Sequence, residues 1–172
     1  DTTLQTNVAL PEIATFGVQH EILDGHTLAG EAAWTRWSKV QELRIKFASG
    51  RSDDVTPLKW KDTMFVAIGA IWKPVKPWTF RFGIAHDETP VPDAERTPRI
   101  PDQDRTWFSA GGSYEIGSFG FDLGYSYIVA RRARVMLSDT GATTDPNRFR
   151  GNLNGNFDAS VHIFTGQMRF SF

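Results

Sequence analysis

Strict alternation between large apolar residues and small or polar residues is the feature that most constrains the fold of this 172-residue chain. In the stretch FGFDLGYSYIV, at 119–129, every second side chain is large and apolar, and Gly, Asp, Gly and Ser occupy the positions between the first five of them. Residues two apart on a strand lie on the same face of a sheet, whereas a helix repeats every 3.6 residues. The period therefore predicts strands with one apolar face and one small, polar face.

The same alternation recurs along most of the chain, and almost no segment has helical periodicity. In DTMFVAIGAIW, for example, Met64, Val66 and Ile68 form one row. We expect seven strands, at 13–23, 28–47, 59–73, 77–87, 105–115, 119–131 and 158–172. The segment from Trp34 to Phe47 is the one weak helical candidate, but its β-branched residues favour a long strand.

The connections between these strands alternate in length. Short links are expected at 24–27, 73–76 and 115–118, and long polar connections at 48–58, 88–104 and 132–157. Short turns at one end and long loops at the other are the plan of an outer-membrane β-barrel, whose long loops are extracellular. A soluble β-sandwich is the alternative, but its outward faces would be polar. We therefore predict an all-β fold, a transmembrane antiparallel β-barrel.

Composition excludes several classes of function. The formal net charge of -1 indicates no nucleic-acid partner, and the absence of cysteine excludes disulfides and thiolate metal sites. The four histidines show no ligand spacing, so we expect no metal and no cofactor. No run of 18 apolar residues is present, and strand alternation averages away in a hydropathy window. Since the chain starts at Asp1 without a leader, we expect it to be a processed chain or a piece of one.

Seven strands cannot close an up-and-down barrel, because antiparallel closure needs an even number. Either residues 2–9 supply an eighth strand or the chain is part of a larger barrel. The sequence NVALPEI places Pro11 where a continuing strand would be cut. We therefore expect the chain to be the C-terminal half of something larger.

The end of the chain and one loop carry a family resemblance. Phe172, preceded by Phe170 and Met168 on the same face, resembles the C-terminal signal of bacterial outer-membrane proteins. The stretch RFGIAHDETPVPDAERTPRIPDQDRTWFSAGGSY, followed by FDLGYSYI and the aromatic last strand, resembles the FadL family of outer-membrane transporters of long-chain fatty acids and hydrocarbons. The stretches LPEIATFGV and WTRWS fit the same family, so the similarity covers essentially the whole chain.

The resemblance implies a 14-stranded barrel with an N-terminal plug called the hatch, of which residues 1–172 are the C-terminal part with about seven strands. It implies passive uptake of long-chain fatty acids or other hydrophobic compounds through the lumen, without a cofactor. The expected location is the outer membrane of a Gram-negative bacterium, in contact with lipid and lipopolysaccharide. The hatch and the remaining barrel strands would lie on another chain or a cleaved part.

The long loop at 88–104 points to a ligand site. Pro90, Pro92, Pro98 and Pro101 fix backbone dihedrals and lower the entropy cost of holding one shape, as suits a lid bent toward a lumen. Arg105 starts the next strand with lumen-facing parity, next to Trp107, and a guanidinium there suits a fatty acid carboxylate. The resemblance also places basic residues in the interior ligand site. The alternative is that Arg105 only pins the loop through Asp102 or Asp104.

A second polar group is expected toward the short-turn end of the lumen. Arg81, Arg169 and Gln167 share the lumen-facing parity with Asp122. They are candidate ligand-binding residues that would contact the hatch or the exiting ligand. The alternative is an interstrand charge ladder that fills the barrel.

Three other functions compete with uptake of hydrophobic compounds. A general porin or a structural barrel is the main rival, although a porin lumen should carry more charge than SAGGS and VAIGAI supply. An outer-membrane hydrolase would need a catalytic pair, and His86 with Asp87 is the only His–acid neighbour at the mouth of a strand. Adjacent strand residues point to opposite faces, so these two cannot easily meet. We therefore predict that the protein is not an enzyme.

Overall fold

The fold is almost entirely β-structure in the computed structural model, which describes residues 3–142, 145, 147–148 and 151–172. Short 3-10 turns, η1 (Trp37–Lys39) and η2 (Asp93–Glu95), are the helical segments of this part of the chain. No helix among the described residues is long and apolar enough to cross a membrane. The prediction of an all-β chain is confirmed.

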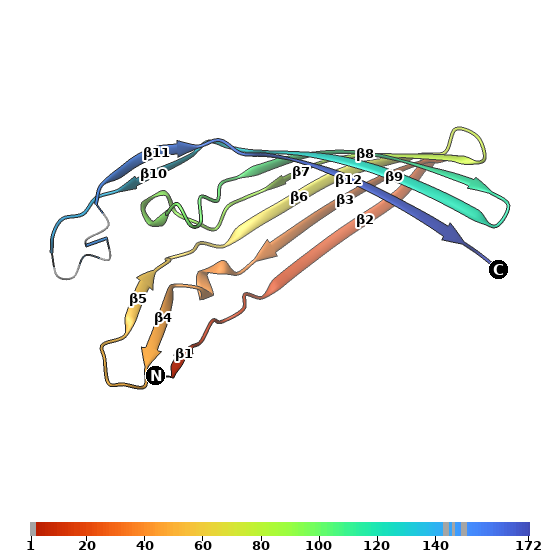
Figure 1. The fold of residues 1–172 in the computed structure, drawn as a ribbon. Coiled ribbons are helices and arrows are strands. Elements are labelled where there is room, and N and C mark those ends of the chain that lie inside the picture. The colour runs from red at the N-terminus through yellow and green to blue at the C-terminus, as the bar shows by residue number, and fades with distance from the viewer. Residues whose placement is uncertain (1–2, 143–144, 146, 149–150) are drawn as a thin grey trace.

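A seven-stranded antiparallel sheet forms the body of the molecule (Figure 1). Its strands, in chain order, are β2 (Ile13–Leu23), β3 (His26–Thr35), β6 (Thr63–Trp72), β7 (Trp78–Asp87), β8 (Arg105–Ile116), β9 (Phe119–Ala130) and β12 (Ser160–Phe170). Each has 10 to 12 residues, the length that a tilted strand needs to cross a bilayer. Apart from the course of 36–47, the seven predicted strands are thus present, and the three short links lie at one end of the sheet.

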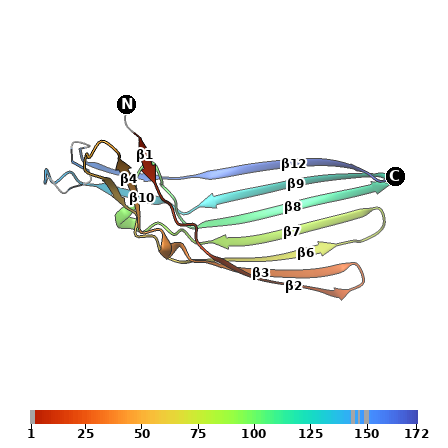
Figure 2. The ribbon, with the colours of Figure 1, turned by 90° about the horizontal axis from the view of Figure 1, so that it is seen from below.

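The sheet is curved like the wall of a half-barrel and is open along both sides (Figures 1 and 2). Its strand order is β12-β9-β8-β7-β6-β3-β2, so β12 and β2 are the edges. Both edge strands run toward the short-turn end, because an even number of reversals separates them. They therefore cannot pair with each other as an antiparallel ladder.

The pairing register separates two faces. Phe108 lies opposite Tyr127 and Ile84, and the same row continues to Ile68 on β6. Large side chains of this face are solvent-accessible in the isolated chain, with 73% of Leu123 and 67% of Ile68 exposed. We call it the apolar face, and its exposure fits a surface that contacts lipid. The opposite face, on the concave side, is the lumen face.

The lumen face consists mainly of small residues. Ala67 lies opposite Ala85, and Gly83 lies opposite Ser109, which in turn pairs with Ser126. The two serine hydroxyls form a hydrogen bond of 2.8 Å across β8 and β9. Small side chains leave the concave side open, which a chain with a solvent-filled or ligand-filled lumen requires.

The prediction of one continuous strand at 28–47 is wrong, because the chain leaves the sheet after Thr35 and begins β4 (Glu42–Phe47) only after the turn η1. The break is stabilised by an edge-on contact between the rings of Trp37 and Trp60, whose centroids are 5.1 Å apart. Asp62 accepts a hydrogen bond of 2.9 Å from the amide of Ser38. Hydrogen bonding from the side chain of Ser38, and then from its amide, lowers the pKa of Asp62, so the tie is intact at neutral pH and weakens as the pH falls through the lowered value.

A small second sheet stands beyond the outer end of the strands. It has the order β1-β4-β5, with β1 (Leu4–Thr6) and β5 (Asp54–Pro57) on either side of β4. The long polar connection predicted at 48–58 thus contains a strand, since β5 pairs with β4 there. Residues 4–6 form a strand, but not an eighth strand of the main sheet, as the proline argument predicted.

A hairpin replaces part of the loop predicted at 132–157. It consists of β10 (Ala133–Leu137) and β11 (Leu153–Phe157), which pair in register from Ala133 with Phe157 to Leu137 with Leu153. The polar composition of this stretch did not suggest it, because only Ala133 and Val135 are buried on β10. Residues 143–144, 146 and 149–150 of the same predicted loop lie outside the described residues.

Candidate functional site in the lumen mouth

The loop at 88–104 folds toward the concave side of the sheet, beneath the β10–β11 hairpin (Figure 1). Its first arm is anchored at the outer end of β6. Glu88 accepts a hydrogen bond of 2.9 Å from the amide of Met64, and the amide of Lys61 donates to the carbonyl of Pro90 at 3.0 Å. The proline-rich loop is thus placed over the lumen mouth.

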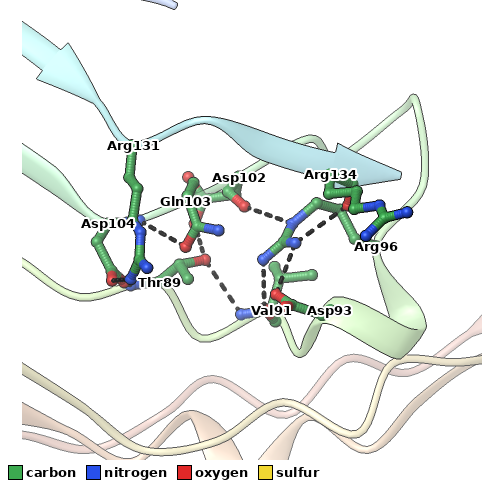
Figure 3. A network of polar contacts seen from close by, with 9 residues as sticks. All are labelled: Thr89, Val91, Asp93, Arg96, Asp102, Gln103, Asp104, Arg131 and Arg134. Atoms are coloured by element: carbon green, nitrogen blue, oxygen red, sulfur yellow. Dashed lines mark hydrogen bonds and ion pairs between the residues drawn. The ribbon is translucent and has the colours of Figure 1, made fainter. Parts of the chain in front are cut away.

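A single buried arginine holds this loop together (Figure 3). Only 1% of Arg96 is exposed. Its guanidinium donates to the carbonyls of Asp102 at 2.9 Å and Val91 at 3.2 Å, and to the carboxylate of Asp93 at 2.7 Å. A further bond of 3.2 Å reaches the carbonyl of Arg134 on β10. One cation therefore ties both arms of the loop to the hairpin above it.

The two aspartates of the PDQDR motif close the loop against its first arm. The Thr89 hydroxyl donates to the carboxylate of Asp102 at 2.6 Å, and the Thr89 amide donates to Asp104 at 3.0 Å. Both aspartates thus accept hydrogen bonds from the first arm of the loop. Neither carboxylate pairs with Arg96 or Arg99 among the described residues.

Arg105 lies where the loop joins the lumen face. Its Nη2 atom is 2.8 Å from the carboxylate of Asp87, the residue opposite it on β7, and its Nη1 atom is 3.4 Å from that of Asp102. Its Nε atom is sealed from solvent and has no hydrogen-bond partner among the described residues, and the same holds for Nε1 of Trp107. An unpaired buried donor costs roughly 1–3 kcal/mol, so two in neighbouring lumen positions mark a place where an acceptor would be favourable.

Two neighbouring hollows lie along the lumen face. The first has about 280 Å³ and is lined in part by Phe65, Ala67, Ala85 and Trp107. The second, of about 300 Å³, begins at Gly83 and Ser109, which both hollows share, and reaches Arg81 and Ile163. Together they form a mainly apolar path from Trp107, two residues beyond Arg105, toward the short-turn end.

The inner polar residues form a connected ladder. Arg81 donates to the hydroxyl of Ser113 at 2.6 Å, and Ser113 donates to Asp122 at 2.5 Å. Asp122 also accepts from Nε of Arg169 at 2.8 Å, and Arg169 lies 3.6 Å from Glu115. This is the arrangement expected of a charge ladder between strands. Gln167 shares the lumen face but has no hydrogen-bond partner among the described residues, so the structure does not join it to the ladder.

A further hollow, of about 660 Å³, lies chiefly on the apolar face and not in the lumen. It is lined mainly by Leu28, Ile68, Ala70, Phe82, Phe108 and Tyr125. These residues belong to the rows that face lipid, and Ala70 and Ala110 leave space between larger neighbours. Its position therefore assigns it to lipid contact and not to the path of a transported molecule.

His86 and Asp87 point to opposite faces, as predicted. His86 pairs with Thr106 on the apolar face, whereas Asp87 is bound to Arg105 on the lumen face. No group of three or more His, Cys, Asp or Glu side chains that could hold a metal ion occurs among the described residues.

Sequence reasoning missed the two residues that organise the site. Arg96 was not distinguished from Arg99, because both lie in the same polar loop and the burial of Arg96 depends on β10. Asp87 was considered only with His86, although its parity relative to Arg105 depends on the β7–β8 register. The alternation of 77–87 already placed Asp87 on the lumen side, and this was the available signal.

The curved antiparallel sheet, the apolar outer face and the small-residue lumen face define the class of protein, an outer-membrane β-barrel. The sequence profile described as "Outer membrane protein transport protein (OMPP1/FadL/TodX)" matches residues 2–172. The chain belongs to this family, which confirms the resemblance inferred from the PDQDR region.

Individual relatives agree with the family. The chain is 35% identical over 134 residues to the "Long-chain fatty acid transport protein" of Escherichia coli O6:H1, covering 77% of this chain and 30% of that protein. It is 26% identical to "Outer membrane protein P1" of Haemophilus influenzae, covering 96% of this chain and 36% of that one. These relatives are named transport and outer-membrane proteins, which points away from an enzyme.

Solved structures show the same architecture. The crystal structure of a Pseudomonas aeruginosa FadL homologue superposes with a TM-score of 0.81 at 30% identity, over 93% of this chain and 35% of that one. The Pseudomonas putida toluene transporter TodX shares the fold with a TM-score of 0.64 at 16% identity. The chain therefore spans about a third of the length of the proteins it matches.

The Arg96 clamp yields a prediction. Replacing Arg96 with alanine leaves the buried carbonyls of Val91 and Asp102 unpaired, which costs about 1–3 kcal/mol for each. We expect proteinase K to cleave within residues 88–104 of the complete folded barrel far faster than in the parent. Arg99→Ala is the matched control, since Arg99 is exposed and has no ion-pair partner among the described residues. Equal cleavage of the two variants would contradict the clamp.

Proposed function

We propose that the complete protein takes up long-chain fatty acids or other hydrophobic compounds across the outer membrane, passively and through the barrel lumen. Residues 1–172 supply the C-terminal strands of a 14-stranded barrel in this proposal, with 48–58, 88–104 and 132–157 on the extracellular side. No catalytic step and no bound cofactor take part. The names of the fatty acid and toluene transporters in the family support this assignment.

The observation that carries the proposal is the apolar path below the loop. The two joined hollows offer a lumen wall of Phe65, Ala67, Ala85, Trp107 and Ile163, with few charges between Arg105 and Arg81. Six residues separate the strand positions of Asp87 and Arg81, a distance of about 20 Å. An extended long-chain fatty acid has a comparable length. The path thus suits a long apolar chain better than a hydrated sugar.

A direct comparison of solutes tests this function. Cells or liposomes carrying the complete barrel should take up oleate faster than protein-free controls, while the flux of a small sugar stays near background. A general porin is the main alternative, and its wide polar lumen would pass the sugar without any dependence on oleate. Sugar flux without oleate uptake would therefore replace the transporter with a porin.

Arg105 is the proposed contact for a ligand carboxylate, with Trp107 beside it. The bond of Arg105 to Asp87 is the shorter of its two ion pairs, so an incoming carboxylate would more easily replace Asp102 at 3.4 Å. Nε of Arg105 and Nε1 of Trp107 are further donors that lack partners. Both are sealed from solvent, so a small shift of the loop side chains must accompany binding. Arg81, Arg169 and Gln167 would meet the ligand later, near the short-turn end.

Exchange of Arg105 for alanine separates the two roles considered for it. If Arg105 holds the carboxylate, fatty acid binding should weaken by roughly 1.5–3 kcal/mol, the scale of a charge-assisted hydrogen bond. Binding of an uncharged alkane should change far less. If Arg105 only ties the loop, both ligands should lose affinity equally and residues 88–104 should lose protease resistance. Affinities measured for both ligands decide between these roles.

Trp107→Phe is a useful companion variant, because it keeps an aromatic ring and removes the indole N–H. A loss confined to the fatty acid would support donation from Nε1, and equal losses for both ligands would reduce Trp107 to a packing role.

The remaining barrel strands and the hatch lie, in our proposal, on another chain or another part of the precursor. Open sheet edges cannot face hydrocarbon, yet β2 and β12 have no partner on their outer sides among the described residues. Since both edges run in the same direction, an odd number of further strands must close the wall. Glu31 adds to the argument, because this lumen-facing carboxylate has no hydrogen bond or ion pair among the described residues. The missing part would supply its partner.

Mass spectrometry of the purified native protein tests this incompleteness. We expect the folded species to contain more polypeptide than the 19.3 kDa of this chain. A single 19.3 kDa species that folds alone in detergent or lipid would overturn the proposal, because its two edges would then be stable without partner strands.

A further inference from the structure

A run of arginines follows the outer end of β9, and its side chains do not contact Arg105 or Trp107. The strand ends at Ala130, and Arg131, Arg132 and Arg134 come next. The side chains of Arg131 and Arg132 are 77% and 67% exposed. We call these three residues the rim arginines.

The rim arginines carry more positive charge than their neighbours balance. Arg132 has a close partner, Asp158, at 2.8 Å. Arg131 lies 3.9 Å from Asp104, whose carboxylate already accepts the amide of Thr89. Arg134 has no carboxylate partner among the described residues and pairs on β11 with the uncharged Asn156. The guanidinium of Arg134 thus has no carboxylate partner there, and that of Arg131 has only a long contact to a carboxylate that is already engaged.

The cavity next to the rim arginines is also lined by more cationic than anionic side chains. It has about 440 Å³ and lies between the rim arginines and the 88–104 loop. Its lining consists of the rim arginines, Lys61 and the loop residues Thr89, Val91, Pro92, Asp93, Arg96, Gln103 and Asp104. Asp93 is engaged by Arg96, and Lys61 has no ion-pair partner among the described residues. The cavity gives an anion room beside the exposed guanidinium groups.

The backbone directs two of the rim arginines to the outside of the barrel wall. The amide of Arg131 donates to the carbonyl of Asp104, which continues the register in which Arg105 pairs with Ala130. Arg131 thereby keeps the parity of Tyr127 and Val129, which lie on the apolar face.

The direction of the Arg134 side chain follows from the alternation of buried and exposed residues on β10. Ala133 and Val135 are buried, with 2% and 0% exposed, while Arg134 between them is exposed. The 88–104 loop lies on the concave side beneath β10 (Figure 1), and Arg96 of that loop bonds to the Arg134 carbonyl. The side chain of Arg134 therefore projects away from the lumen.

The position of the rim arginines along the strand direction indicates which anion they meet. Tyr127 stands near the outer end of the apolar face, where aromatic side chains mark the membrane interface. Arg131 follows four residues later, roughly 13 Å along the strand. Cations at this level meet the head groups of the outer leaflet, which in a Gram-negative outer membrane carry the phosphates of lipopolysaccharide. Arginine binds phosphate with two parallel hydrogen bonds, so it suits this role better than a point charge.

From these observations we infer that Arg131 and Arg134, with Arg132 beside them, bind a phosphate group of lipopolysaccharide at the outer rim of the barrel. The site is separate from the lumen, and it does not depend on which compound the barrel transports.

The test compares the complete barrel with its Arg131→Gln/Arg134→Gln variant in detergent, using purified lipid A that bears both phosphates as the probe. We expect the double variant to bind about tenfold or more weakly, as for the loss of charge-assisted hydrogen bonds. Its affinity should also depend less on sodium chloride, because fewer charges are screened. Arg51→Gln is the matched control, since Arg51 is an exposed arginine on a different outer loop. Oleate uptake should be unchanged in both variants.

Two further probes identify the source of the anion. Dephosphorylated lipid A should bind the parent as weakly as the double variant binds the phosphorylated form. If it binds the parent as well as phosphorylated lipid A does, the phosphate contact is refuted. Inorganic phosphate at millimolar concentration should fail to displace lipid A, and full displacement would make this a small-anion site and not a lipid site. Equal lipid A binding by parent and double variant would also overturn the inference.

Discussion

Hydrocarbon offers no hydrogen bonds, and this single constraint governs the structure. Every backbone N–H and C=O group inside the membrane must find its partner within the protein. Five inner strands meet this demand on both sides, while β2 and β12 meet it on one side only. If further strands complete the wall, as proposed, the common direction of these two edges requires their number to be odd. The arrangement of faces follows from the same demand, because a closed wall leaves one face for lipid and one for the lumen.

In the loop at 88–104, backbone carbonyls also need hydrogen-bond donors, and one side chain supplies donors to several of them. A loop of 17 residues over the lumen mouth has many carbonyls and little apolar surface to bury. Arg96 supplies donors for the carbonyls of Val91, Asp102 and Arg134 at once, and its own charge is balanced by Asp93. The four prolines reduce the entropy that this clamp must overcome. The loop is therefore ordered by a buried cation and stiff backbone, and this order places Arg105 beside Asp87.

The sequence predicts features that depend on the local alternation of side chains. It does not predict features that depend on contacts between residues far apart in the sequence. The alternation of 119–129 or 64–72 is sufficient to assign strands and faces, since lipid and lumen each impose one side-chain type. The β-branched residues of Trp34 to Phe47 suggested that the strand continues through 36–47, yet the chain turns away there because Trp37 packs on Trp60 and Ser38 bonds to Asp62. Arg105 and Trp107 could be selected from parity. The burial of Arg96 could not, because the residue that covers it belongs to a hairpin that composition does not reveal.

The paired state of Arg105 bears on selectivity among hydrophobic compounds. An alkane can enter the hollow at Trp107 without touching the ion pairs, whereas a carboxylate must take a place now held by Asp102. The geometry keeps the cost of that exchange low. Asp102 would retain the hydroxyl of Thr89, and the Arg96 clamp uses the backbone carbonyl of Asp102 and not its side chain. If Arg105 binds a ligand carboxylate as proposed, the loop could stay in position while the carboxylate of Asp102 is replaced, and one mouth could admit both acidic and neutral ligands.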